Sequence, residues 1–68
     1  MSMSKAKKEA LEALHSTREK KHAKQRELEE LIQSTPKDVR QAQETELLAT
    51  IDRLKYEEAN CERAFKSS

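Results

Sequence analysis

The sequence contains no glycine and no tryptophan, and it has one proline, one cysteine, one phenylalanine and one tyrosine. Gly-rich phosphate loops and the nucleophile elbow of hydrolases depend on glycine, so a chain without it cannot form them. We therefore expect no enzymatic activity and no cofactor. A single cysteine, Cys61, also cannot form a disulfide within the chain.

Long apolar runs are absent as well. No stretch has the apolar core of a signal peptide, and none approaches the roughly 20 apolar residues that span a bilayer. We expect a cytoplasmic protein without a membrane span, with a nuclear setting as the alternative.

What the sequence does contain is helix-forming and charged. Ala, Leu, Glu, Lys, Arg and Gln fill most of the 68 residues, 40% are charged, and the net charge is only +1. A chain this short makes one domain at most. The composition predicts an all-α fold, with a flexible N-terminus at residues 1–4 and a tail at residues 67–68.

A helix start signal divides the chain. Thr35 is placed to cap a helix, Pro36 suits the first helical position, and Asp38 stands where a capping carboxylate belongs. We predict a helix over about residues 5–33, a turn at 34–35 and a second helix over about 36–66. Because so short a turn favours antiparallel neighbours, residues 5–66 should form a single two-helix antiparallel coiled-coil hairpin. Thr35-Pro36 also has the form of a proline-directed phosphorylation site, although capping explains both residues.

Charge suggests a register for this hairpin. With the turn centred between residues 34 and 35, residue i lies opposite about residue 69 minus i. Basic residues then face acidic ones along the whole length, as in the pairing of the run from Arg18 to Arg26 with Glu44, Glu46 and Asp52. Exposed ion pairs contribute little to stability, so these charges are expected to favour the antiparallel alignment over others without stabilising the hairpin much.

An apolar stripe runs along the second helix with the alternating spacing of a coiled coil: Leu47, Ile51, Leu54, Glu58, Cys61 and Phe65. The first helix has large apolar side chains to pack against this stripe only near its two ends, because residues 15–27 contain none. The predicted hairpin core is Leu11, Leu14, Leu28, Leu31, Ile32, Cys61 and Phe65.

This gap points to a binding surface. In the register above, Leu47, Leu48 and Ile51 lie beside Arg18, Lys21 and His22 and are incompletely covered. We predict that they, extended by Leu54, bind a partner, and that the isolated chain is marginally stable or self-associates. The alternative is that the aliphatic stems of lysine and arginine close the gap, or that a different register hides it.

Other chemical sites are weaker. His15, Glu19 and His22 share a helical face but lack the spacing of a known metal motif, so we expect no metal. Cys61 has no histidine near it in the predicted register, which argues against a nucleophile.

The predicted function is a non-enzymatic protein–protein interaction module, such as an adaptor, assembly factor or small chaperone. Its partner would be a helix of another protein or a second copy of the chain. One alternative is nucleic-acid binding through the basic face of the first helix, although no aromatic side chains stand among the charges to stack on bases. The other alternative is a structural coiled-coil spacer.

Overall fold

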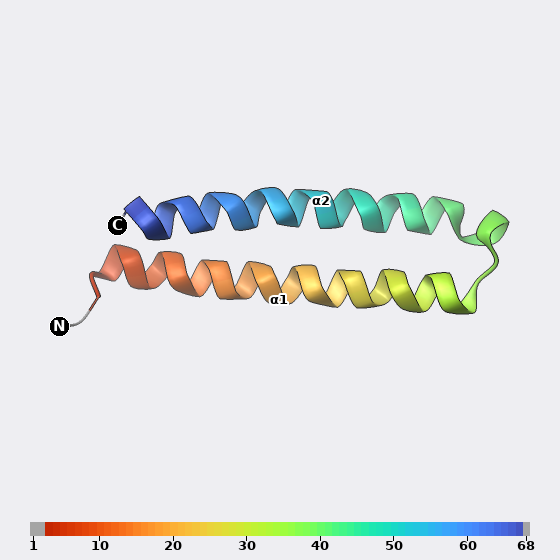
Figure 1. Cartoon of the computed structure of the whole chain (residues 1–68), viewed down its shortest axis with the longest axis horizontal. Helices are drawn as coiled ribbons and strands as arrows, with labels where there is room; N and C mark the ends of the chain where they lie inside the picture. The colour runs from red at the N-terminus through yellow and green to blue at the C-terminus, as the bar shows by residue number, and fades with distance from the viewer. Residues whose placement is uncertain (1–2, 68) are drawn as a thin grey trace.

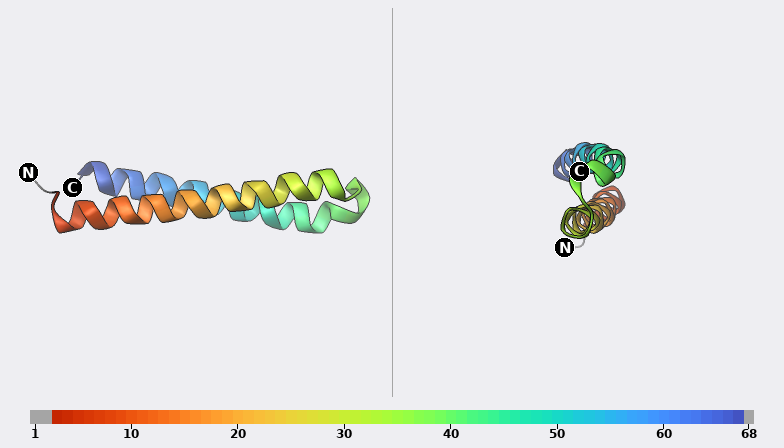
Figure 2. Two further views of the ribbon diagram at one scale, coloured as in Figure 1. Left: turned by 90° about the horizontal axis from the view of Figure 1, so that it is seen from below. Right: turned by 90° about the vertical axis from the view of Figure 1, so that its right-hand side faces the viewer.

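A computed structural model describes residues 3–67, so the predicted flexibility of Met1 and Ser2 and the tail position of Ser68 lie outside the described residues. It contains two helices, α1 (Lys5–Ser34) and α2 (Lys37–Ser67). They lie side by side in opposite directions, with both ends of the chain at the same end of the molecule (Figure 1). Figure 2 shows the two helices crossing at a shallow angle. The predicted all-α antiparallel hairpin is therefore confirmed, as a rod of 54 × 16 × 11 Å.

The end of the rod away from the turn, here called the open end, contains the start of α1 and the end of α2. A side-chain cap lies at the start of α1. The Ser4 hydroxyl oxygen accepts a hydrogen bond from the Lys7 backbone N–H at 3.2 Å, and the Ser4 carbonyl accepts one from Lys8 at 3.0 Å. These bonds satisfy amide groups that have no partner inside the helix. Ser4, which the sequence analysis assigned to the flexible N-terminus, therefore caps α1, and Ser67 belongs to α2 and not to a tail.

The turn is held by one arginine. Thr35 is extended, with its N–H bonded to the Leu31 carbonyl, and so ends α1. Arg40 donates through Nη1 to the carbonyls of Thr35 at 2.8 Å and Ile32 at 3.4 Å. The first backbone bonds of α2 are accepted by the Pro36 carbonyl, so α2 begins one residue later than predicted and Thr35 closes the preceding helix. Asp38 lies in the first turn of α2, where its charge complements the helix dipole.

The core is thin. Leu14, Ile51 and Leu54 are the buried apolar side chains, at 4 to 5% exposure, and Thr17 is buried among the polar ones. The predicted core residues Leu11, Leu28, Leu31, Cys61 and Phe65 are half-buried.

Ile32 does not belong to the core, because its side chain is 44% exposed. Neighbouring residues of a helix point about 100° apart, so Leu31 and Ile32 cannot both face α2. Leu31 takes the position beside α2, and Ile32 is turned outward two residues before α1 ends.

The predicted register is wrong. Lys21, expected opposite Leu48, contacts Glu58, which lies ten residues further along α2, and Thr17 meets Cys61 instead of Asp52. The positions of the apolar stripe are three or four residues apart, so registers displaced by seven or by about ten residues present nearly the same pattern. The contacts of Glu58 distinguish between such registers, because they bring the one acidic residue of the stripe beside two basic residues of α1.

Candidate functional site

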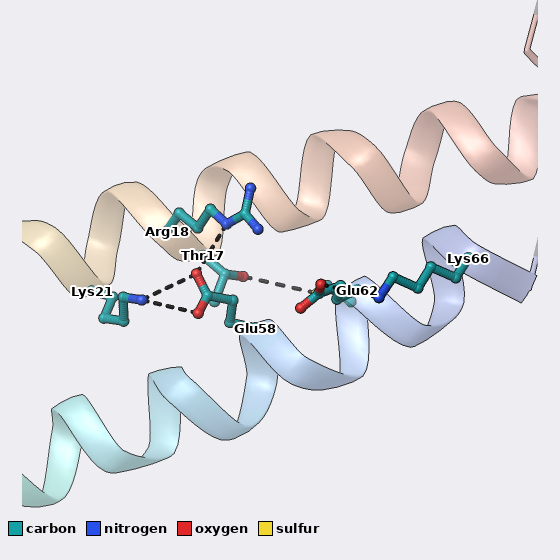
Figure 3. Close-up of polar contacts among 7 residues, drawn as sticks. Thr17, Arg18, Lys21, Glu58, Glu62 and Lys66 are labelled. Carbon is teal, nitrogen blue, oxygen red and sulfur yellow. Dashed lines mark hydrogen bonds and ion pairs between the residues drawn. The ribbon is translucent and has the colours of Figure 1, made fainter.

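A charged layer crosses the middle of the interface between the helices (Figure 3). The Lys21 ammonium donates to both carboxylate oxygens of Glu58, at 2.9 and 3.2 Å, and Arg18 Nε donates to Oε2 at 3.1 Å. The Lys21 and Glu58 side chains are only 16% and 18% exposed. The hydrogen bond from Lys21 lowers the pKa of Glu58, burial opposes this shift, and Arg18 adds to the lowering. Glu58 is therefore a register-specifying contact within the hairpin.

A second polar contact follows one turn further along α2. The Thr17 hydroxyl and the Cys61 thiol lie 4.0 Å apart, both facing the interface between the helices. Cys61 is a half-buried free thiol, and it fills the seam as the small apolar side chain that the stripe predicts. Within residues 3–67, no three His, Cys, Asp or Glu side chains gather in a way that could hold a metal ion.

The four residues predicted to bind a partner have separate environments. Ile51 and Leu54 are buried in the hairpin, so the expectation that Ile51 is left uncovered is wrong. The part of α1 that lacks large apolar side chains contributes three half-buried residues, Lys21, Lys24 and Gln25. The gap is thus closed within the chain at Ile51, as the alternative of a different register or of aliphatic cover anticipated.

The other two leucines keep accessible surface. Leu47 is half-buried at the edge of the seam, whereas Leu48 is 47% exposed. Because they are consecutive, they point about 100° apart: Leu47 belongs to the stripe and lines a groove, whereas Leu48 lies beside the stripe and does not line that groove. A single helix laid on the hairpin cannot cover both, and their role in partner binding stays a prediction.

A groove lies along the flank on which Leu47 is exposed. It has a volume of about 330 Å³ and is lined from α1 by Lys24, Glu27 and Leu31 and from α2 by Gln43, Glu46, Leu47 and Thr50. Leu31 and Leu47 are its large apolar side chains, one from each helix. The remaining lining side chains are charged or polar and form a rim around them.

Sequence reasoning missed this groove because it concentrated on the central stripe. Gln43, Glu46 and Thr50 follow helical steps of three and four residues, which place them in a row beside Leu47. This row flanks the coiled-coil stripe, where polar side chains are usual. Val39, which is 68% exposed, stands one turn before Gln43 and extends the same row toward the turn.

The basic run of α1 is largely neutralised inside the chain. Arg18 and Lys21 are held by Glu58, and Lys24 pairs with Glu27 at 3.1 Å. Within residues 3–67, the ion pairs that join the two helices all involve Glu58, and the others lie within one helix, as Arg40–Glu44 does. The prediction of opposed charges along the whole length is therefore wrong, because the register brings basic and acidic side chains together at one level only.

In the described part of the chain, neither helix is long and apolar enough to cross a membrane. Comparison of the sequence and the structure with protein-family models, curated proteins and solved structures finds no match.

Proposed function

We propose that this chain is a non-enzymatic protein–protein interaction module, an adaptor, assembly factor or small chaperone, which binds an amphipathic helix along the groove of Leu31 and Leu47. The observation that carries the proposal is the groove itself, which lies between the two antiparallel helices and is lined by one leucine from each helix together with charged and polar side chains. A third helix laid there would complete a bundle. Helix-in-groove recognition uses a few apolar anchors at helical spacing, and neighbouring charges set the orientation.

The thin core supports the proposal. Among residues 3–67, three apolar side chains are buried, while Ile32, Val39, Leu48 and Tyr56 are each more than 40% exposed. Small domains start near balance between burial and conformational entropy, so additional buried apolar surface gives a considerable gain in stability. A partner helix on Leu31 and Leu47 would supply such surface.

The ion pairs favour a protein partner over nucleic acid. Phosphate binding requires basic side chains that are free to release counterions from the polymer. Three of the five basic residues between Arg18 and Arg26 are already paired with carboxylates of the same chain. The groove rim also carries both signs of charge, which suits the mixed surface of an amphipathic helix.

The test uses two matched threonines of α2. Thr45 and Thr50 each donate a hydroxyl hydrogen bond to the backbone carbonyl four residues earlier, but only Thr50 lines the groove. In Thr50→Arg a long side chain would occupy the groove, whereas Thr45→Arg adds the same charge to the same helix outside it. Each chain is used as bait in extracts of its native cell, and helicity is checked by circular dichroism.

We expect the parent chain and Thr45→Arg to capture proteins that Thr50→Arg does not capture. Once such a partner is purified, it should bind the parent chain and Thr45→Arg more tightly than it binds Thr50→Arg. Equal capture by both variants would show that the groove is not the binding site. Capture that requires nucleic acid and falls steeply with salt would support the basic-helix function in its place.

A further inference from the structure

The charges of the hairpin are divided between its two ends. Residues 27–49, which form the half with the turn, carry six acidic and two basic side chains, a net charge of −4. Residues 3–26 and 50–67, which form the open half, carry twelve basic and seven acidic side chains, a net charge of +5. The two segments meet at the level where Lys24 and Thr50 line the same groove. The rod therefore has a negative turn end and a positive open end.

We propose that the groove is occupied by a second copy of this chain, packed lengthwise and antiparallel, so that the turn end of each hairpin lies along the open end of the other. This inference rests on the proposed function and specifies its partner. The resulting assembly is a symmetric four-helix bundle in which both copies use the same face.

Side-chain size on the groove face agrees with this arrangement. Eighteen residues make five full turns of helix, so Ala13 lies on the same side of α1 as Leu31, and Ala6 on the same side as Lys24. Both alanines are exposed and belong to the open half. By the same rule Phe65 lies on the same side of α2 as Leu47, so the open half of this face carries one large apolar side chain on α2 and small ones on α1. In an antiparallel pair, Leu31 of each copy would approach Ala13 of the other, where the small side chain lets the helices come close.

The face is large enough for a stable contact. The groove lies between the two helices, and a side of the rod that contains both helices measures 54 by 16 Å. A standard interface takes roughly 800 Å² from each partner, which such a face can supply.

Electrostatics selects the direction. In the antiparallel pair, each end with a net charge of −4 lies beside an end of +5. A parallel pair would place like-charged ends together along the whole rod. At helix-packing distances of about 10 Å, which are close to the Debye length in physiological salt, this difference is only partly screened. Charge complementarity of this kind fixes register and orientation more than affinity.

The first experiment measures the mass of the full chain by sedimentation equilibrium, with Ala13→Glu and Ala59→Glu as a matched pair. Ala59 is nine residues from Thr50, which is two and a half turns, so it lies on the opposite side of α2 from the groove. Both alanines are exposed, so neither change is expected to unfold the hairpin, which circular dichroism checks. We expect a dimer that Ala13→Glu weakens by roughly tenfold or more and that Ala59→Glu leaves within about twofold of the parent chain.

The second experiment determines orientation by energy transfer between two singly labelled chains. Donor and acceptor are attached through Lys37→Cys at the turn end or Lys66→Cys at the open end, each combined with Cys61→Ser. The antiparallel dimer places position 37 of one copy near position 66 of the other, and it holds two position-37 labels apart by about the 54 Å length of the rod. We therefore expect strong transfer for the 37–66 pair and weak transfer for the 37–37 pair.

The outcomes separate this inference from the proposed function. A chain that stays monomeric, a dimer with strong 37–37 transfer, or a dimer disrupted equally by Ala59→Glu would each overturn the antiparallel second copy. If the monomeric chain still captures another protein in a manner that Thr50→Arg abolishes, the groove remains a binding site and only its occupant was assigned wrongly. A chain that neither forms a dimer nor captures another protein through the groove would contradict the proposed function as well.

Discussion

The thin core makes the hairpin sensitive to single truncations, and Leu54→Ala is the most informative of them. Leu54 is 5% exposed, and it belongs to the stripe of α2 that packs on α1. Truncation of a buried leucine removes its transfer free energy and leaves a cavity, which together cost about 2 to 5 kcal/mol. A domain of 68 residues has a total unfolding free energy of roughly 3 to 10 kcal/mol, at about 0.05 to 0.15 kcal/mol per residue. Leu54→Ala should therefore remove at least a fifth of the stability and could remove all of it.

Leu48→Ala is the matched control, because it makes the same change on the same helix at a side chain that is 47% exposed. It forfeits only part of the burial, and alanine is the better helix former, so we expect a loss below about 1 kcal/mol. The free energy of unfolding is measured by urea titration, followed by circular dichroism, at a protein concentration low enough to suppress association. The corresponding fall in Tm for Leu54→Ala is about 8 °C or more.

Two results would refute this reasoning. Equal losses for both variants would mean that the two leucines are equally buried, and that the seam does not run through Leu54. A loss below about 0.5 kcal/mol for Leu54→Ala, in the range of ordinary surface substitutions, would mean that α2 does not pack on α1 through this stripe.

Two further predictions concern the register and the topology. Since the folded state lowers the pKa of Glu58, this carboxylate stabilises the hairpin above its unfolded pKa of about 4.3, and the contribution is lost as the pH falls through the folded value. The gap in Tm between the parent chain and Glu58→Gln should therefore be present at pH 7 and close on acidification, and a gap that is unchanged at low pH would refute the ion-pair assignment. Labels at positions 8 and 66 should lie close together, because Lys7 Nζ stands 5.1 Å from the centre of the Phe65 ring, whereas a single continuous helix would separate them by about 87 Å.

The hairpin could be predicted because its signals are local. The break between the two helices is marked by Thr35, Pro36 and Asp38. Helix-forming residues fill the sequence on both sides of this break, so a helix is expected on each side. The stripe of α2 follows from helical periodicity alone. None of these signals requires knowledge of which residues of α1 lie opposite.

The register could not be read from that periodicity, because a stripe with steps of three and four residues matches itself after a slip of seven or of about ten residues. An acidic residue within the apolar stripe was the informative feature. Placing Glu58 opposite Arg18 and Lys21 would have selected the observed alignment, since a partly buried carboxylate requires basic partners. The environments of Ile51 and Leu48 depend on this alignment and on helix rotation, and for that reason they were assigned to one surface although they lie in different surroundings.

The groove lay beyond sequence reasoning for a related reason. It combines residues of α1 and α2 that become neighbours only when the register and the rotation of both helices are known. Once Leu31 and Leu47 are placed on the same flank, the row from Gln43 to Thr50 becomes recognisable as a rim.

The most direct test of the central claim, that the flank of Leu31 and Leu47 is the interaction surface, is a methyl NMR titration that follows the assigned leucines as the protein concentration is raised. We predict that the methyl resonances of Leu31 and Leu47 shift together in a saturable manner, while those of Leu48, which is exposed outside the groove, stay in place. Saturable shifts at Leu48 with unchanged Leu31 and Leu47 would contradict the claim and move the interface to the surface around Leu48.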